Sequence, residues 1–299
     1  MAKAKKNKIT TTGWEYALKV INIISLVIIA FTMLYPFWEI LVKSFMTDEE
    51  INSNIFCLWP TKFQFRGYVK IFTDKTYRFG QAFLNSIFIT VLGTIYQLLI
   101  TSLASYALSR EELPGKKILF TYFIITMYFG GGIIPYYIVI RNLGLRNNIM
   151  VMVLPFFMSV YNMLIMRNFY SNIPKEMEEA AKLDGASDWA VFFKVVFPLS
   201  GAIMATIALY IAVGQWNNWY TALLFLDQDP TKRPLAYTLQ YIIEKSTSAN
   251  DIIGGINVEI IGQSVSSAAI VVAVFPIMMV YPFFQKYFTN GVLVGSVKG

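Results

Sequence analysis

The sequence predicts an all-α membrane protein that crosses the bilayer six times. Hydrophobic residues make up 56% of the 299 residues, charged residues only 14%, and the mean hydropathy is +0.52. This composition is far from that of a soluble globular domain. Windows of about 20 apolar residues, the length that crosses roughly 30 Å of hydrocarbon, recur along the chain. The six windows are 17–42, 83–108, 118–140, 149–169, 199–226 and 264–284.

The connections between the windows set the expected topology. Residues 43–82 and 227–263 form two long connections, which we expect on the outer side, and 170–198 forms an inner loop. Six spans place both termini on the same side. Four lysines in the first eight residues favour the cytoplasm for that side. The expected organisation is a basic cytoplasmic tail at 1–15, a membrane domain at 16–290 and a cytoplasmic tail at 291–299.

Two windows contain residues that interrupt helices. Pro36 is expected to kink or end the first span, and Trp38 suits the outer membrane interface. In the third window, glycines at 130–132 and Pro135 break the helix. Broken backbone at membrane depth is tolerated only where it is buried in protein or lines a cavity. This run is therefore either the wall of a path through the membrane or a helix end at the outer interface.

The inner loop reads as two short helices joined by a glycine. Strong helix formers at 175–183 follow Pro174, and Gly185 can take the positive φ that ends a helix. A helical pattern resumes from Ala186 and continues to Pro198. Acidic side chains and small alanines on the first helix suit close approach by another protein. The acidic side chains are Glu176, Glu178, Glu179 and Asp184.

The inner loop also resembles a known motif. Glu179-Ala180-Ala181, Gly185 four residues later and Pro198 thirteen residues after the glycine match the cytoplasmic signature loop of ABC-importer permeases. The resemblance implies the type I ABC importer permease fold and contact between this loop and an ATPase subunit. Val195 and Phe197 replace the Ile and Leu that the family prefers. An ordinary amphipathic loop is the alternative. The residues expected to couple to the ATPase are Glu179, Ala180, Ala181, Asp184, Gly185 and Pro198.

The resemblance narrows to carbohydrate-uptake permeases at the end of the chain. Residues 290–299 are similar to the terminal segment of maltose-type permeases, so Gly295 and Lys298 are expected in a flexible tail that contacts the ATPases. A disordered end is the alternative. The runs 130–137 and 143–145 resemble a subgroup that handles complex oligosaccharides.

The resemblance implies a bacterial plasma-membrane importer for carbohydrate, and for oligosaccharide in particular. The implied partners are a second related permease, two ATPase subunits, an extracellular solute-binding protein and membrane lipid. An importer of another solute, such as a peptide or a phosphate ester, is the alternative. Cationic residues within the spans would favour it, and none is found in mid-span.

The fifth window contains the densest polar and aromatic cluster within a span. Amides in hydrocarbon are costly unless they are satisfied, so they should face the bundle interior or water. Amides can bind sugar hydroxyls and aromatic rings can pack on sugar C–H faces. An aromatic belt with amide contacts between helices is the alternative, and the partner permease could make the main substrate contacts. The candidate substrate-path residues, with the aromatic ones on one helical face, are Gln215, Trp216, Asn217, Asn218, Trp219 and Tyr220.

No catalytic or metal site is expected. The chain has one cysteine, Cys57, and no histidine. Its only Gly-Lys pair, Gly115-Lys116, lies in a short turn and not in a phosphate-binding loop, so ATP and Mg²⁺ are expected on the partner ATPase. A membrane-embedded enzyme would need His, Cys or paired acids at membrane depth, and Glu39 is the only acid near a window. Scattered basic residues argue against nucleic-acid binding.

Overall fold

The computed structural model describes residues 13–54, 56–247 and 262–296, and every regular element in these residues is helical. Three helices are long and apolar enough to cross a membrane, and the number rises to six if each of three bent helix pairs is one span. The predicted all-α class is thus confirmed.

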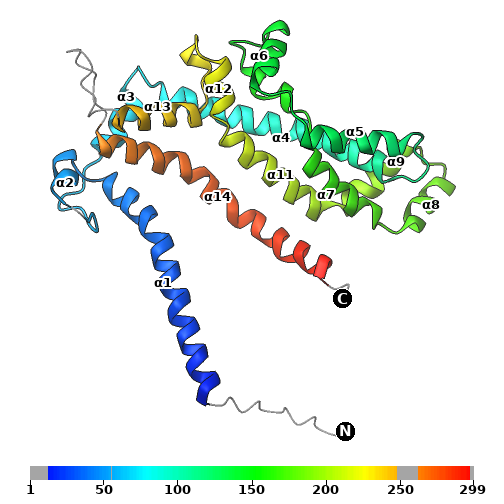
Figure 1. The fold of residues 1–299 in the computed structure, drawn as a ribbon, viewed down its shortest axis with the longest axis horizontal. Helices are drawn as coiled ribbons and strands as arrows, with labels where there is room; N and C mark the ends of the chain where they lie inside the picture. Colours follow the sequence, from blue (N-terminus) through cyan, green and yellow to red (C-terminus); the bar gives the residue numbers. More distant parts are fainter. Residues whose placement is uncertain (1–12, 55, 248–261, 297–299) are drawn as a thin grey trace.

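The first long helix, α1 (Gly13–Lys43), projects away from the other helices (Figure 1). Pro36 lies within α1 without ending it. Apolar side chains along its whole length are exposed, among them Ile21, Val27 and Phe31. Two short helices follow, α2 (Asp48–Ser53) and α3 (Arg66–Thr73). Because α1 buries almost nothing against this chain, its apolar surface is available to lipid or to another subunit.

The second long helix, α4 (Phe79–Ser109), forms the centre of the bundle and packs against α7 (Val160–Ser171) and α11 (Gly201–Trp216). Its buried face is small and polar, which lets membrane helices approach closely and exchange hydrogen bonds. Ser102 Oγ and the Tyr170 hydroxyl lie 2.6 Å apart, and Ser105 Oγ donates to the Met163 carbonyl at 3.0 Å.

Three windows are bent rather than straight. In the third, α5 (Lys116–Tyr128) and α6 (Ile133–Asn142) meet at 112°. Gly132 has φ +81° at this bend, and glycines 130–132 are exposed. The fourth begins with 3-10 turns at Ile149–Met152 and Leu154–Phe156 and bends by 45° into α7. The fifth is broken after Trp216 and resumes as α12 (Tyr220–Phe225).

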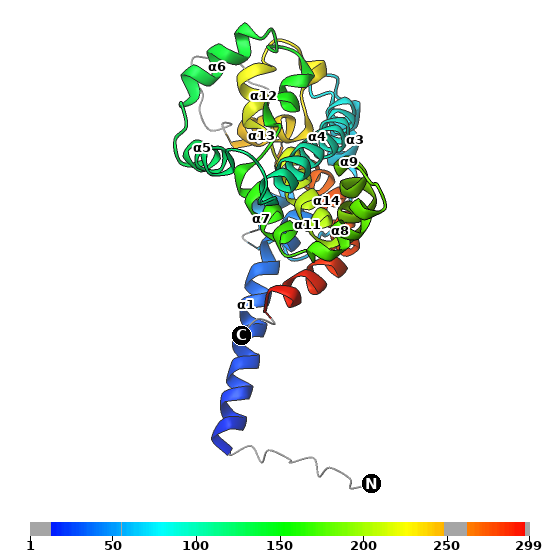
Figure 2. The same cartoon turned by 90° about the vertical axis from the view of Figure 1, so that its right-hand side faces the viewer.

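The two ends of the bundle carry different elements. At one end lie α2, α3, a 3-10 turn (Pro230–Lys232) and α13 (Leu235–Thr247), and at the other lie α8 (Lys175–Leu183) and α9 (Asp188–Val191), as Figure 1 shows. A π-helical turn (Phe192–Val196) and α10 (Phe197–Leu199) connect α9 to α11. Figure 2 looks along the bundle from the side of α8.

The third long helix, α14 (Gln263–Ser296), contains the last window and packs on α3, α11, α13 and α1. A Cβ on Gly67 would lie 2.8 Å from the Ser264 carbonyl oxygen, so α3 reaches α14 only because residue 67 is glycine. Beyond residue 290 the chain continues as helix to Ser296, where the sequence predicted a flexible tail.

Candidate functional site

The inner loop begins with α8, which has one buried and one exposed face. Glu178 is only 5% exposed and Ala181 packs against a cluster of buried residues from α7 and α11. On the opposite face Glu179 and Ala180 are exposed, and Leu183 is 89% exposed. The spacing of three and four residues places these exposed side chains together on one surface.

The glycine between the two helices has the predicted conformation, with φ +83° at Gly185. The Gly185 N–H donates to the Lys182 carbonyl and the Ala186 N–H donates to the Ala181 carbonyl, both at 3.0 Å. These two bonds form a Schellman motif, which satisfies the last carbonyls of α8. The helix therefore ends at a fixed angle.

Two polar contacts hold the second half of the loop. Ser187 Oγ accepts from the Ala190 N–H, so α9 begins at Asp188 rather than at Ala186, where the sequence pattern resumes. Lys182 Nζ lies 2.9 Å from Asp188 Oδ1 across the elbow, and this hydrogen bond raises the pKa of Lys182.

Pro198 lies inside α10 and does not open the next helix. The chain instead bends by 83° at Ser200, the residue between α10 and α11.

Arg110 joins this loop to the end of α4. Its guanidinium forms a two-pronged ion pair with the Glu178 carboxylate, which is 7% exposed at the side chain. The Tyr106 hydroxyl donates to Glu178 Oε2 at 3.3 Å, and the guanidinium stacks 4.1 Å from the centre of the Tyr106 ring. Sequence analysis missed this group because its members lie 68 residues apart.

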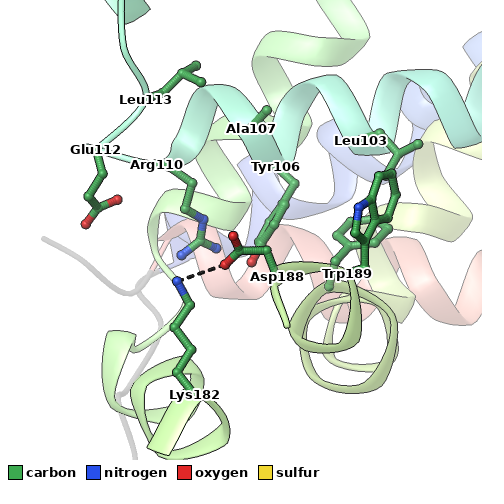
Figure 3. Close-up of a pocket in the computed structure, with 10 residues that line it drawn as sticks. Leu103, Tyr106, Ala107, Arg110, Glu112, Leu113, Lys182, Asp188 and Trp189 are labelled. Atoms are coloured by element: carbon green, nitrogen blue, oxygen red, sulfur yellow. Dashed lines mark ion pairs between the residues drawn. The ribbon is translucent and has the colours of Figure 1, made fainter. Parts of the chain in front are cut away.

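A pocket of about 500 Å³ lies beside this ion pair, between the end of α4 and α9 (Figure 3). Leu103 and Tyr106 of α4, and Arg110 directly after it, face Trp189 and Asp188 across it. Trp189 is 64% exposed and stacks on Phe193.

The aromatic residues Trp216, Trp219 and Tyr220 do not lie on one continuous helix, because α11 ends at Trp216 and α12 begins at Tyr220, so the prediction that they share one helical face is wrong. Gln215 and Trp216 are buried at the end of α11, and Trp216 Nε1 donates to the Ala273 carbonyl of α14 at 3.2 Å. The Trp216 ring also packs edge-on against Phe83. Trp216 therefore holds α11, α4 and α14 together.

The helix break separates the other members of the cluster. Asn217 caps the end of α11, and Asn218 Oδ1 accepts from the Thr221 N–H at the start of α12. Trp219 and Tyr220 are 37% and 48% exposed, with ring centres 5.7 Å apart. Asparagine favours such capping positions over helix interiors, which explains the break.

A group of hydrogen bonds that the sequence did not reveal joins the loop after α6 to the loop after α12. Asn147, at φ +54°, donates its N–H to the Phe225 carbonyl at 2.8 Å. Its side chain exchanges two hydrogen bonds with Gln228, one to the side chain and one from the backbone N–H. Lys232 Nζ donates to the Asn147 carbonyl at 2.8 Å. The only local signal was an asparagine, which tolerates positive φ.

Gly295 and Lys298 were predicted to lie in a tail that contacts the ATPases, and the structure describes only the first of them. Gly295 lies in the last turn of α14, and Lys298 lies outside the described residues. Within the described residues, no group of three or more His, Cys, Asp or Glu side chains could hold a metal ion.

Residues 115–294 match the family described as binding-protein-dependent transport system inner membrane component. The chain belongs to this family. It is 40% identical over 277 residues to a polygalacturonan/rhamnogalacturonan transport system permease protein of Bacillus subtilis, covering 92% of this chain and 96% of that protein. It is 37% identical over 284 residues to protein LplC of the same organism, covering 94% of each.

The family assignment agrees with a solved structure. A bacterial ABC transporter involved in the import of the acidic polysaccharide alginate contains a chain with a TM-score of 0.83 and 29% sequence identity, covering 93% of this chain and 99% of that chain. This member of the binding-protein-dependent family is therefore a multi-pass membrane component of an ABC importer with the type I permease fold. It is a transport subunit and not an enzyme. ATPase and solute-binding partners follow from the family.

Proposed function

We propose that this permease imports carbohydrate, and oligosaccharide in particular, and forms half of the path through the membrane. The names of the similar proteins support this proposal. The Bacillus subtilis relative is named for polygalacturonan/rhamnogalacturonan transport, and the transporter of known structure is involved in the import of alginate. The exposed Trp219 and Tyr220 remain candidates for the path wall. Gln215 and Trp216 are buried in this chain and act there in packing.

One observation carries the coupling role. Leu183 is 89% exposed at the end of α8, next to exposed Glu179 and to the fixed elbow at Gly185. A large apolar side chain so exposed on a rigid polar helix fits a surface that another protein covers. That protein is the ATPase, which contacts the knob formed by α8 and α9. The proposed coupling residues are Glu179, Ala180, Ala181, Asp184, Gly185 and Pro198, together with Leu183.

The exposed surface of α1 and the position of the knob indicate how this chain is arranged with its partners in the membrane. The exposed apolar length of α1 fits lipid on one side and a second, related permease on the other. The knob lies at the opposite end of the bundle from α13, and both α1 and α14 run away from the α2 and α3 end (Figure 1). Both termini are therefore placed on the cytoplasmic side in this proposal. ATP and Mg²⁺ bind to two ATPase subunits.

The test is ATPase activity of the complete complex in lipid. The complex contains this chain, the partner permease, two ATPase subunits and the solute-binding protein, and it is assayed with neutral oligosaccharides, acidic oligogalacturonides, peptides and phosphate esters. Stimulation by an oligosaccharide is the expected result. Stimulation by peptides or phosphate esters alone would contradict the carbohydrate assignment.

A matched pair of variants tests the knob. Leu183→Asp should abolish capture of the ATPase subunits by the purified permease pair. Leu143→Asp is the control, because Leu143 is 65% exposed but follows α6, remote from the knob. Equal capture by both variants would contradict the proposed docking surface.

A further inference from the structure

We propose that α4 is a rigid rod that links the knob to the outer loop, with Arg110 and Glu178 as its inner joint. The proposal rests on the proposed function, because it assigns the path by which the state of the ATPase reaches the outer surface. Three features carry it: the partly buried ion pair at one end of α4, a set of hydrogen bonds at the other, and an uninterrupted helix between them.

The inner joint is the ion pair between Arg110 and Glu178. The Glu178 side chain of this pair is 7% exposed and the Arg110 side chain is 26% exposed. By contrast, Lys175 and Glu111 join the same two segments at 3.2 Å with side chains that are 63% and 73% exposed. Exposed pairs contribute little, whereas a two-pronged pair to a buried carboxylate fixes both distance and angle. A movement of α8 is thus transmitted to the end of α4.

The outer joint lies at the start of α4. Asn85 Nδ2 donates to the carbonyls of Thr231 and Arg233, at 2.7 and 3.0 Å. Ser86 Oγ accepts from the Leu235 N–H at 2.7 Å and so caps the start of α13. Asn85 is 8% exposed and Ser86 is 2% exposed. These bonds fix the outer loop that follows α12 directly to the rod.

The helix between the joints is continuous. Of the three long helices in the described residues, α4 alone contains no proline, because Pro36 lies in α1 and Pro276 and Pro282 lie in α14. The other windows are bent or broken. From Asn85 to Ser109, its last residue, α4 rises roughly 36 Å at 1.5 Å per residue, and Arg110 follows directly as its C-cap. In Figure 1 α4 runs the length of the bundle from α13 to α9. A continuous helix moves as one body, so a displacement of Arg110, which is bonded to the last turn of α4 through its N–H, reaches Asn85.

The experiment measures a change in the environment of the outer loop when the ATPase is trapped, and it needs no sugar. Cys57 is the only cysteine of the chain and is buried, so Cys57→Ser provides a clean background. Gln240→Cys places an environment-sensitive fluorophore on the exposed side of α13. The complex with cysteine-free partners in lipid nanodiscs is then trapped with ATP, Mg²⁺ and vanadate. The fluorophore should respond to trapping when α4 is intact.

The inner joint is tested with Arg110→Gln/Glu178→Gln, which removes both charges and leaves no uncompensated one. We expect the fluorescence change to fall at least fivefold, with basal ATPase activity within twofold of the parent. The control is Glu111→Gln/Lys175→Gln, which removes the exposed pair between the same segments and should keep the full change. Equal responses in the two double variants would overturn the proposal.

The outer joint gives an independent test that leaves the knob untouched. Asn85→Leu/Ser86→Ala should lose the fluorescence change to the same extent, and combining it with the inner variant should cause no further loss. If the inner variant does not assemble, a full response in the outer variant overturns the proposal. The proposal is also overturned if the parent complex hydrolyses ATP but its fluorescence does not change on trapping. A parent complex that hydrolyses no ATP contradicts the proposed function instead.

Discussion

Gly93 of α4 lies directly against the side chain of Gln215 of α11. A Cβ on Gly93 would lie 2.9 Å from Gln215 Nε2 and 3.0 Å from its Cδ. Gln215 is 6% exposed, and its Oε1 has no hydrogen-bond partner among the described residues. The close packing of α4 on α11 at this point therefore requires glycine at residue 93.

Replacing Gly93 with leucine should separate α4 from α11. Overpacking of this kind costs about 1–3 kcal/mol. We expect a lower melting temperature of the purified complex. Gly214→Leu is the matched control, because residue 214 is exposed and a Cβ there meets nothing within 4 Å. Gly93→Ala combined with Gln215→Ala should recover stability relative to Gly93→Ala alone. If Gly93→Leu melts like the parent, the close contact does not limit stability.

Replacing Gly185 with valine should uncouple ATP hydrolysis from uptake. The residue has φ +83° with open space around it, so the cost is conformational, about 1–2 kcal/mol. Gly185→Asn should be milder, because asparagine tolerates this conformation. Gly201→Val is the control, since residue 201 also has open space but lacks a positive φ. The measurement is sugar transported per ATP hydrolysed, and an unchanged ratio in Gly185→Val would remove the elbow from the mechanism.

Trp216 and Trp219 should respond differently to truncation. Trp216→Ala leaves a cavity between α11, α4 and α14 and is expected to cost about 3–5 kcal/mol of stability. Trp219→Ala removes a side chain that is 37% exposed and should leave the melting temperature unchanged. If Trp219 lines the path, its variant raises the KM for uptake. Normal uptake by Trp219→Ala, and by Tyr220→Ala, would assign the substrate contacts to the partner permease.

The outer loop should keep its structure across physiological pH. Hydrogen bonds from Thr231 and Lys232 lower the pKa of Asp229 to about 2. A depressed folded-state pKa stabilises the loop above the ordinary pKa of about 3.9 and loses this effect as pH falls towards 2. Hydrogen exchange of residues 227–233, corrected for intrinsic rates, should therefore match at pH 5 and pH 7.5. Asp229→Ala should exchange faster at both, whereas the control Asp74→Ala should not. A marked difference between pH 5 and pH 7.5 in the parent would contradict this assignment.

Local features of the sequence predicted much of the fold. The six apolar windows needed only composition and length, because crossing hydrocarbon requires about 20 apolar residues wherever a span packs. The two-helix knob needed only helix propensity and Gly185, because a positive φ is a property of a single residue. The bends at Gly132 and after Trp216 were harder to place, since the same residues also occur within continuous membrane helices.

The sequence by itself determined that this chain is helical, crosses a membrane and presents a knob with a glycine elbow, because these properties depend on neighbouring residues. Tertiary structure alone decided that Arg110 pairs with Glu178, that Asn85 holds the loop around Thr231, and that Trp216 is buried while Trp219 is exposed. These contacts join residues far apart in the chain or on opposite sides of a helix break. Their energy comes from burial and from paired hydrogen bonds, and both exist only once the helices have packed.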